Sequence, residues 1–224
     1  MNYKPFWKKS LGFFPLGAGN AFYSYFYKGN RFEYLRSRFQ FQETELDVLE
    51  LLWEDGKIQT TFLSAGLDAE IMRLTRRTPH AGFGDYFIAG VKGLLQAKAH
   101  FSFRVLIDGE EQQFDNGVSL TLAKIPYFGF GLRSLIGKVD STDEKVYGLA
   151  VVNTHSSISN KLVRLWALLF ANFNLHKAPF IVLQGKEIEI KSENFFPLQA
   201  GGEYLGSTRW IKVKVIRKQK VLVV

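Results

Sequence analysis

The chain of 224 residues contains no cysteine. A disulfide framework, a thiolate metal site and a cysteine nucleophile are therefore excluded, and a reducing compartment is allowed. The four histidines lie far apart and show no His–His or His–carboxylate spacing typical of a metal site. The sequence also lacks internal repeats and low-complexity linkers.

Long apolar runs are missing as well. Residues 162–173 form the most apolar helical stretch, but Arg164 interrupts it and it is shorter than the roughly 20 residues of a membrane span. Residues 1–14 contain lysines and aromatics, without the apolar core and small-residue cleavage site of a signal peptide. We expect a cytoplasmic protein, soluble or peripheral at the membrane.

The composition supports a globular fold with a basic surface. Hydrophobic residues make up 46% of the chain, enough for a real core. The 29 Lys and Arg residues against 21 Asp and Glu give a formal net charge of +8, which favours partners that carry phosphate. Nucleic acid is the least favoured of these, because the basic alternation at Lys212 and Lys214 has only Trp210 nearby as a stacking aromatic.

Short segments with period-two alternation dominate from residue 43 onward. They predict a mainly β (α+β) fold, a β-sandwich-like domain with peripheral helices over residues 43–224. Residues 46–53 and 57–63 flank a turn and predict a hairpin, while helical spacing predicts helices over 68–77 and 86–97. Further strands are predicted over residues 101–107, 118–125, 147–153, 180–184, 187–190 and 209–215.

A glycine-rich turn lies near the amino terminus. Residues 15–20 (PLGAGN) follow a short apolar run and precede a helix predicted over residues 21–27. Such a turn can offer backbone N–H groups and a helix terminus to a phosphate, although a plain strand-to-helix turn has the same pattern. A single strand–turn–helix unit needs partner strands, so residues 1–42 are predicted to be the remnant of an α/β domain.

Five segments, in order along the chain, resemble the diacylglycerol kinase and sphingosine kinase family of lipid kinases. Each is weak alone, but together they extend over about residues 11–224. The segments are residues 15–20 (PLGAGN, family PLGTGN), 62–70 (FLSAGLDAE, family GFDAE), 125–132 (IPYFGFGL, family NGPYYGGGL), 143–148 (DEKVYG, family DDGxxD) and 197–203 (PLQAGGE, family PLQADGE).

The resemblance implies an ATP-dependent kinase for a lipid hydroxyl, with Mg²⁺ and with nucleotide bound between two domains. It assigns Gly17, Gly19 and Asn20 to cofactor binding. The family's GGDGT phosphate loop has no counterpart here, so we expect the chain to represent the carboxyl-terminal part and to bind nucleotide poorly alone. The missing half would then come from another chain or from an upstream start, and a homodimer is an alternative cover for the exposed surface.

The chain departs from the family where the implied acids should be. Gly201 stands at the place of the carboxylate that is implied to act as the base, and Glu203 is the candidate catalytic substitute. Asp143 and Glu144 are the candidate metal ligands, although Lys145 adds a competing cation and Gly148 replaces the last acid. Glu203, Asp143 and Glu144 also suit ordinary solvated turns.

Two functions therefore remain open. The first is a lipid-kinase-like protein that phosphorylates a lipid hydroxyl when completed by the other half. The alternative is a catalytically inactive pseudoenzyme that acts as a lipid-binding or interaction module. The apolar stripe over residues 162–173, flanked by basic residues, suits core packing or contact with a lipid or membrane surface.

Overall fold

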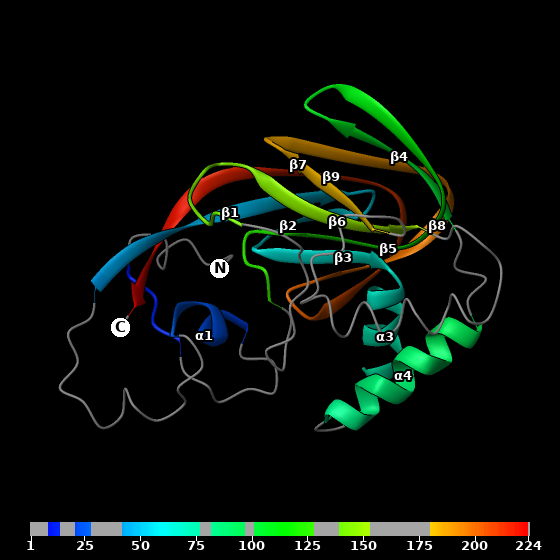
Figure 1. Cartoon of the computed structure of the whole chain (residues 1–224), viewed down its shortest axis with the longest axis horizontal. Helices are drawn as coiled ribbons and strands as arrows, with labels where there is room; N and C mark the ends of the chain where they lie inside the picture. Colours follow the sequence, from blue (N-terminus) through cyan, green and yellow to red (C-terminus); the bar gives the residue numbers. More distant parts are fainter. Residues whose placement is uncertain are drawn as a thin grey trace.

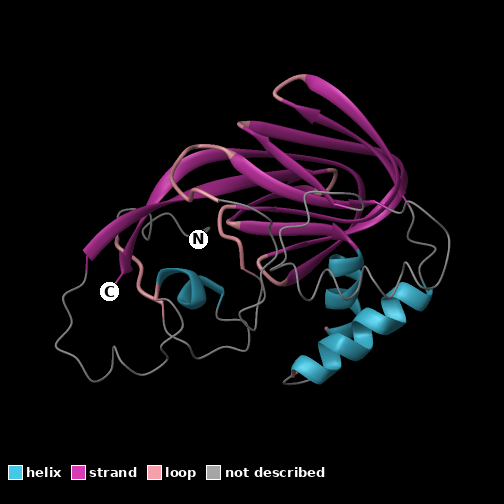
Figure 2. Ribbon diagram, in the orientation of Figure 1, coloured by secondary structure: helices cyan, strands magenta, loops and turns pink. Residues whose placement is uncertain are grey.

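The computed structural model describes residues 9–13, 21–27, 42–76, 82–96, 101–127, 139–152 and 180–223. This part of the chain is built on a nine-stranded sheet in which neighbouring strands pair antiparallel (Figures 1 and 2). The strands are β1 (Gln42–Trp53), β2 (Gly56–Thr60), β3 (Phe62–Gly66), β4 (Phe101–Ile107), β5 (Glu110–Ala123), β6 (Val146–Val152), β7 (Phe180–Gly185), β8 (Glu187–Ala200) and β9 (Glu203–Val223).

The order of the strands is β2-β1-β9-β8-β3-β5-β6-β7, and β4 pairs with β5 and β8. β3 and β4 thus lie end to end between the two long strands β5 and β8, and together they fill one strand position in the sheet. β3 pairs with residues 119–123 of β5, and β4 pairs with residues 110–117. On the other side, β3 pairs with residues 198–200 of β8 and β4 with residues 188–192.

Two helices are inserted between β3 and β4. The chain leaves the sheet at Gly66, forms α3 (Leu67–Thr75) and α4 (Phe83–Gln96), and returns to the sheet at Phe101. Gly66 has φ +81°, a left-handed conformation that suits glycine, so the sharp exit from β3 into α3 depends on this residue. Both helices lie below the sheet in Figure 1, on the side away from the β4–β5 hairpin.

Two apolar clusters lie on opposite faces of the central strands. In β6, Val146 and Ala150 pack into the larger cluster, while Leu149 and Val151 pack into the smaller one, beside Leu67 of α3. This alternation is the period-two pattern expected of a strand covered on both faces. The larger cluster includes Leu49, Leu51, Leu63, Phe103, Val105, Leu120, Leu122, Leu183, Ile188, Ile190, Phe196, Leu198, Ile211 and Val213.

The short helix α1 (Ala21–Phe26) packs where β1 and β9 meet. Phe13 and Phe22 stack with ring centroids 4.7 Å apart, and both contact the cluster of Leu46, Ile125 and Val221. The helix thus begins where the sequence predicts it. The division of the chain into residues 1–42 and 43–224 stays a prediction.

The predicted mainly β, sandwich-like fold is confirmed, and so are the hairpin before residue 63 and both later helices. Four strands extend well beyond their predicted bounds, and the first of them, β1, begins at Gln42 instead of residue 46. β5 begins at Glu110, β8 extends to Ala200 and β9 extends from Glu203 to Val223. The pairing register shifts within each of these strands, and such irregularities break the strict alternation on which the sequence prediction depended.

Candidate functional site

The β8–β9 turn is the part of the predicted site that the structure describes most fully. Gly201 and Gly202 have φ values of +60° and +89°, which are typical of a tight two-residue hairpin turn with a left-handed backbone. The Gly201 N–H donates to the Phe62 carbonyl oxygen at 3.0 Å, and the Gly202 N–H donates to Gln199 Oε1 at 3.0 Å. The turn is therefore held from two sides.

Gln199 joins two of the family-like segments. Its side chain is buried, and its Nε2 donates to Ser64 Oγ at 2.7 Å. Gln199 also lies directly opposite Ser64 in the pairing of β3 with β8. Residues 62–70 and 197–203, far apart in sequence, thus form one structural unit at the point where β3 gives way to α3.

Asp68 lies in the first turn of α3 within this unit. Its carboxylate accepts a hydrogen bond from the Thr121 hydroxyl at 3.1 Å. Burial raises the pKa of Asp68 to about 6, and the neighbouring Ser119 and Thr121 hydroxyls offset only part of that rise. The sequence reasoning treated this residue only as part of a motif, so its perturbed carboxyl is a finding of the structure.

The Asp68→Asn variant is expected to be more stable than the wild type at pH 7, by up to about 3 kcal/mol. The folded pKa lies above the unfolded value, so the native wild type binds the extra proton between about pH 4 and 6 and loses stability as the pH rises through 6. The advantage of the variant should vanish near pH 4. Urea unfolding at both pH values measures it, with exposed Asp55→Asn as the control. Equal stabilities at pH 7 would contradict the assignment.

The candidate catalytic residue Glu203 is the first residue of β9 and is exposed, opposite Ala200 in the hairpin. Glu203 lies beside the turn that contains Gly201, and its catalytic role stays a prediction. The cofactor-binding candidates Gly17, Gly19 and Asn20 lie outside the described residues and stay predictions too.

The candidate metal ligand Asp143 is bound by side chains of this chain. Its Oδ1 lies 2.9 Å from Lys124 Nζ, and its Oδ2 accepts a hydrogen bond from the Tyr147 hydroxyl. Lys124 is fully buried, and its Nζ also lies 3.0 Å from Asp47 Oδ2 and donates to the Lys145 carbonyl oxygen at 2.6 Å. We call Asp47, Lys124, Asp143 and Lys218 the buried ion cluster: the Asp47 and Lys124 side chains have no exposed surface, while those of Asp143 and Lys218 are 24% and 34% exposed. Lys218 Nζ lies 3.3 Å from Asp47 Oδ1.

Protonation of the cluster follows from these contacts. Burial pushes the pKa of Asp143 upward, but the hydrogen bonds from Tyr147 and Lys124 outweigh burial and hold the pKa below its ordinary value. Burial, together with the hydrogen bond to Asp143, raises the pKa of Tyr147 to about 12. Asp143 is therefore a carboxylate at neutral pH, and Tyr147 is a neutral donor to it.

These residues do not fit a resident divalent cation. Both Asp143 oxygens have protein partners, and an ammonium lies in contact with the side where a cation would bind. Glu144 is exposed and contributes its backbone N–H to Asp47 Oδ2 at 2.7 Å. No group of three or more acidic or histidine side chains suited to a metal occurs among the described residues. The assignment of Asp143 and Glu144 as metal ligands stays a prediction.

Gly148, where the family pattern has its last acid, is a packing position in the structure. A Cβ added there would lie 2.6 Å from Leu122 Cδ2 and 3.3 Å from the Thr121 carbonyl oxygen. The strand pairing places Gly148 between Leu122 of β5 and Leu183 of β7. A side chain at this position would therefore require Leu122 to move and would crowd the Thr121 carbonyl oxygen and Leu183 Cβ.

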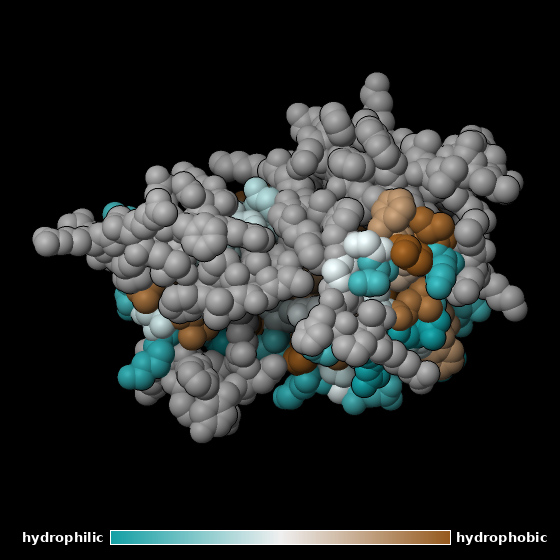
Figure 3. All heavy atoms as spheres, turned by 90° about the horizontal axis from the view of Figure 1, so that it is seen from below, coloured by the Kyte–Doolittle hydropathy of each residue, from teal (hydrophilic) through white to brown (hydrophobic). Residues whose placement is uncertain are grey.

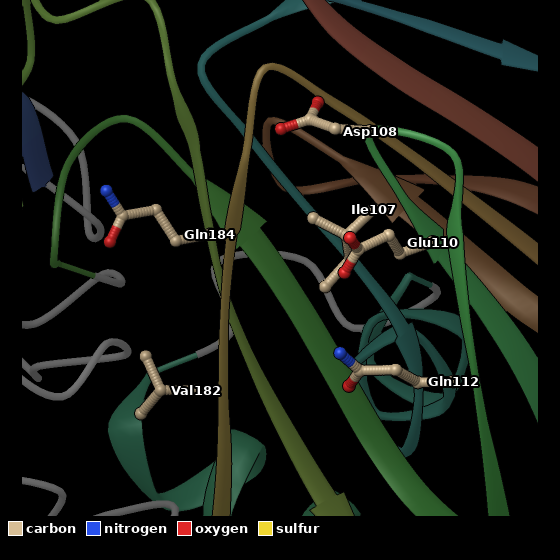
Figure 4. Close-up of a pocket in the computed structure, with 6 residues that line it drawn as sticks. All are labelled: Ile107, Asp108, Glu110, Gln112, Val182 and Gln184. Carbon is tan, nitrogen blue, oxygen red and sulfur yellow. The ribbon is translucent and has the colours of Figure 1, made fainter.

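Two surface features lie apart from the turn and the buried ion cluster. One is an open polar groove between the β4–β5 hairpin and β7, lined by Ile107, Asp108, Glu110, Gln112, Val182 and Gln184 (Figure 4). The other is apolar: Phe87 and Ile88 of α4 are 44% and 54% exposed, and Figure 3 shows apolar side chains over this part of the surface. None of the described helices is both long and apolar enough to span a bilayer.

The fold is an antiparallel, sandwich-like sheet with two helices inserted between β3 and β4. Residues 61–218 match the model of the YegS C-terminal NAD kinase beta sandwich-like domain, which is more than half of the chain, and the protein belongs to this family. The family resemblance that the five segments predict is thereby confirmed. No curated protein matches the chain.

Solved structures show the same fold. A putative diacylglycerol kinase from Bacillus anthracis strain Sterne superposes with a TM-score of 0.66 at 16% identity, covering 96% of this chain and 70% of the other. Another structure described in the same words gives 0.64 at 14% identity, with coverages of 96% and 69%. A third, described as a diacylglycerol kinase from the same strain, gives 0.59 at 13% identity, with 96% and 67%. At these identities the likeness establishes the fold.

Proposed function

We propose that this protein is a lipid-kinase-like protein whose sandwich domain binds the lipid acceptor, and that transfer of a phosphoryl group to the lipid hydroxyl needs a carboxylate which the β8–β9 turn lacks. The observation that carries the proposal is the turn itself. Its backbone conformation and its anchors to Phe62 and Gln199 are fully formed, while Gly201 occupies the place of the implied base.

Glycine at position 201 bears directly on phosphoryl transfer. Phosphoryl transfer requires a group that orients or deprotonates the attacking hydroxyl, and a positioned carboxylate contributes about 10²–10⁴-fold to the rate. Glycine has no such group, and Glu203 lies two residues further along the chain, at the start of β9. ATP and Mg²⁺ are implied by the kinase class, and the magnesium would arrive with the nucleotide, because the buried ion cluster does not fit a divalent ion.

The Gly201→Asp variant is expected to gain activity. Aspartate tolerates the left-handed conformation at φ +60° better than most residues, and a Cβ there would lie 3.8 Å from Thr60 Oγ1, an ordinary contact. If the rest of the site is present, transfer of labelled phosphate from ATP–Mg²⁺ to diacylglycerol or sphingosine should rise by about 10²-fold or more over the wild type.

The controls separate the alternatives. Gly201→Asn has a similar shape but no base, so it should stay at the wild-type rate. A wild-type activity that the Glu203→Gln variant abolishes would instead assign the base to Glu203. If neither the wild type nor Gly201→Asp transfers phosphate, even with a nucleotide-binding half supplied as a second chain, the kinase proposal fails.

A non-catalytic lipid-binding module is the second candidate, favoured by the exposed apolar side chains of α4. Phe87 and Ile88 lie on α4, which packs against α3, the helix that follows β3. Apolar side chains on a surface helix can enter the headgroup region of a membrane. Flotation with liposomes that contain diacylglycerol tests this candidate, and inactive protein that floats would favour it over the kinase.

A further inference from the structure

Three oxygen atoms converge on the Lys124 ammonium. They are Asp143 Oδ1 at 2.9 Å, Asp47 Oδ2 at 3.0 Å and the Lys145 carbonyl oxygen at 2.6 Å. The Lys124 side chain has no exposed surface. Carboxylate and carbonyl oxygens are also the ligands that hard divalent cations such as Mg²⁺ and Ca²⁺ prefer. The oxygen cage is thus of the kind that holds a metal ion, but the ion in it is an ammonium.

The charges of the buried ion cluster balance without a metal. Lys218 adds a second positive charge, 3.3 Å from Asp47 Oδ1, and its Nζ donates to the Thr142 carbonyl oxygen at 2.6 Å. Within the cluster two carboxylates face two ammonium groups, which together carry the charge of one divalent cation, and the exposed Glu45 carboxylate lies 3.9 Å from Lys218 Nζ at its edge. Buried charges persist only when they are paired in this way.

The cluster joins two strand pairs that are not neighbours in the sheet: Asp47 and Lys218 lie opposite each other on β1 and β9, while Lys124 and Asp143 flank the paired strands β5 and β6. Asp47 belongs to β1, Lys124 follows β5, and Asp143 lies in the loop before β6. The Asp47 N–H donates to the Ser141 carbonyl oxygen at 2.7 Å, so the loop over residues 139–145 is fixed to the middle of β1. The Lys124 ammonium adds to the contacts that hold this loop, because it pairs with Asp143 and donates to the Lys145 carbonyl oxygen.

We propose that the Lys124 ammonium is a built-in substitute for a divalent cation, which makes the fold of this protein independent of metal, and that removing it converts the cage into a divalent-cation site. The oxygens of Asp47, Asp143 and Lys145 would then be the first ligands, with water completing the coordination. The Lys124→Ser variant leaves space for an ion, whereas Lys124→Met fills the same space without charge.

Thermal unfolding of the full chain in EDTA and in MgCl₂, CaCl₂ or MnCl₂ tests the proposal. The wild type should unfold at the same temperature in all four solutions. Lys124→Ser should unfold at a lower temperature in EDTA and recover with at least one divalent cation in a saturable way, because a ligand that binds the native state stabilises it. Lys124→Met should be destabilised without recovery.

Lys212→Ser, at the partly exposed pair with Glu187, controls for general effects of salt and should not respond to divalent cations. Saturable stabilisation of the wild type by a divalent cation would overturn the proposal, since the cage would then accept metal beside the lysine. Failure of Lys124→Ser to fold or to gain stability with any of the three cations would also overturn it. Mn²⁺ binding measured by electron paramagnetic resonance should detect one site in Lys124→Ser and none in the wild type.

Discussion

The Asp47→Ala variant is expected to lose about 3–4 kcal/mol of unfolding free energy, a large part of the stability of a typical domain. Asp47 is fully buried and pairs with Lys124 and Lys218. Its removal leaves the Lys124 ammonium with Asp143 as its remaining acidic partner, and the Glu144 N–H loses its acceptor. Chemical denaturation at neutral pH measures the loss.

A neighbouring pair on the same two strands provides the matched control. Glu43 and Lys220 also join β1 to β9, at 3.1 Å, but their side chains are 51% and 59% exposed. Glu43→Gln should therefore change stability by less than about 1 kcal/mol. If the two variants lose similar amounts, burial is not what makes the Asp47 contacts important. The double variant Asp47→Leu/Lys124→Met should recover part of the loss, because it leaves no unpaired charge between these two positions.

The Gly148→Asp variant is expected to lose about 3–5 kcal/mol or to fail to fold. The new Cβ would meet Leu122 and the Thr121 carbonyl, and the carboxylate would enter the apolar cluster without a partner. Gly148→Ala separates the two causes: it adds only the steric conflict and should lose about 1–3 kcal/mol. Thermal and urea unfolding with circular dichroism measure both variants.

Gly84 near the start of α4 is the control glycine. A Cβ added there meets nothing within 4 Å, so Gly84→Ala should be neutral or stabilising by up to about 1 kcal/mol. A Gly148→Ala variant as stable as Gly84→Ala would show that β6 moves to make space. In that case position 148 could hold an acid, and packing would not be the reason that glycine stands where the family pattern has its last acid.

Much of the fold was predictable because local patterns agree with it. The turn at residues 54–56 and the alternation around it predict the β1–β2 hairpin, and the apolar spacing of residues 86–97 predicts α4 to within a few residues. The lengths of β8 and β9 were not predictable. Pro197 and Gly206 act locally as strand breakers, yet long-range pairing carries both strands through irregular positions.

The candidate site was predictable only in part. The motif at residues 197–203 identified the turn and its missing acid. The partnership of Asp143 with Lys124 and Asp47 could not be read from sequence, because these residues come from three separate segments. One signal was available: Lys124 is the only charged residue between Gly117 and Pro126, and a charge within such an apolar stretch requires a buried partner.

β3 and β4 lie end to end between β5 and β8, so the sheet contains a continuous frame, β5 and β8, and a separate insertion, α3 and α4, between the two short strands. β5 and β8 run past the break unbroken and keep their hydrogen bonds to whichever strand lies between them, so the frame does not depend on the chain inserted there. The α3–α4 excursion can therefore change in length or surface character while the sandwich stays intact. Relatives with different acceptors are expected to differ in sequence at this insertion and to keep β5 and β8 on either side of it.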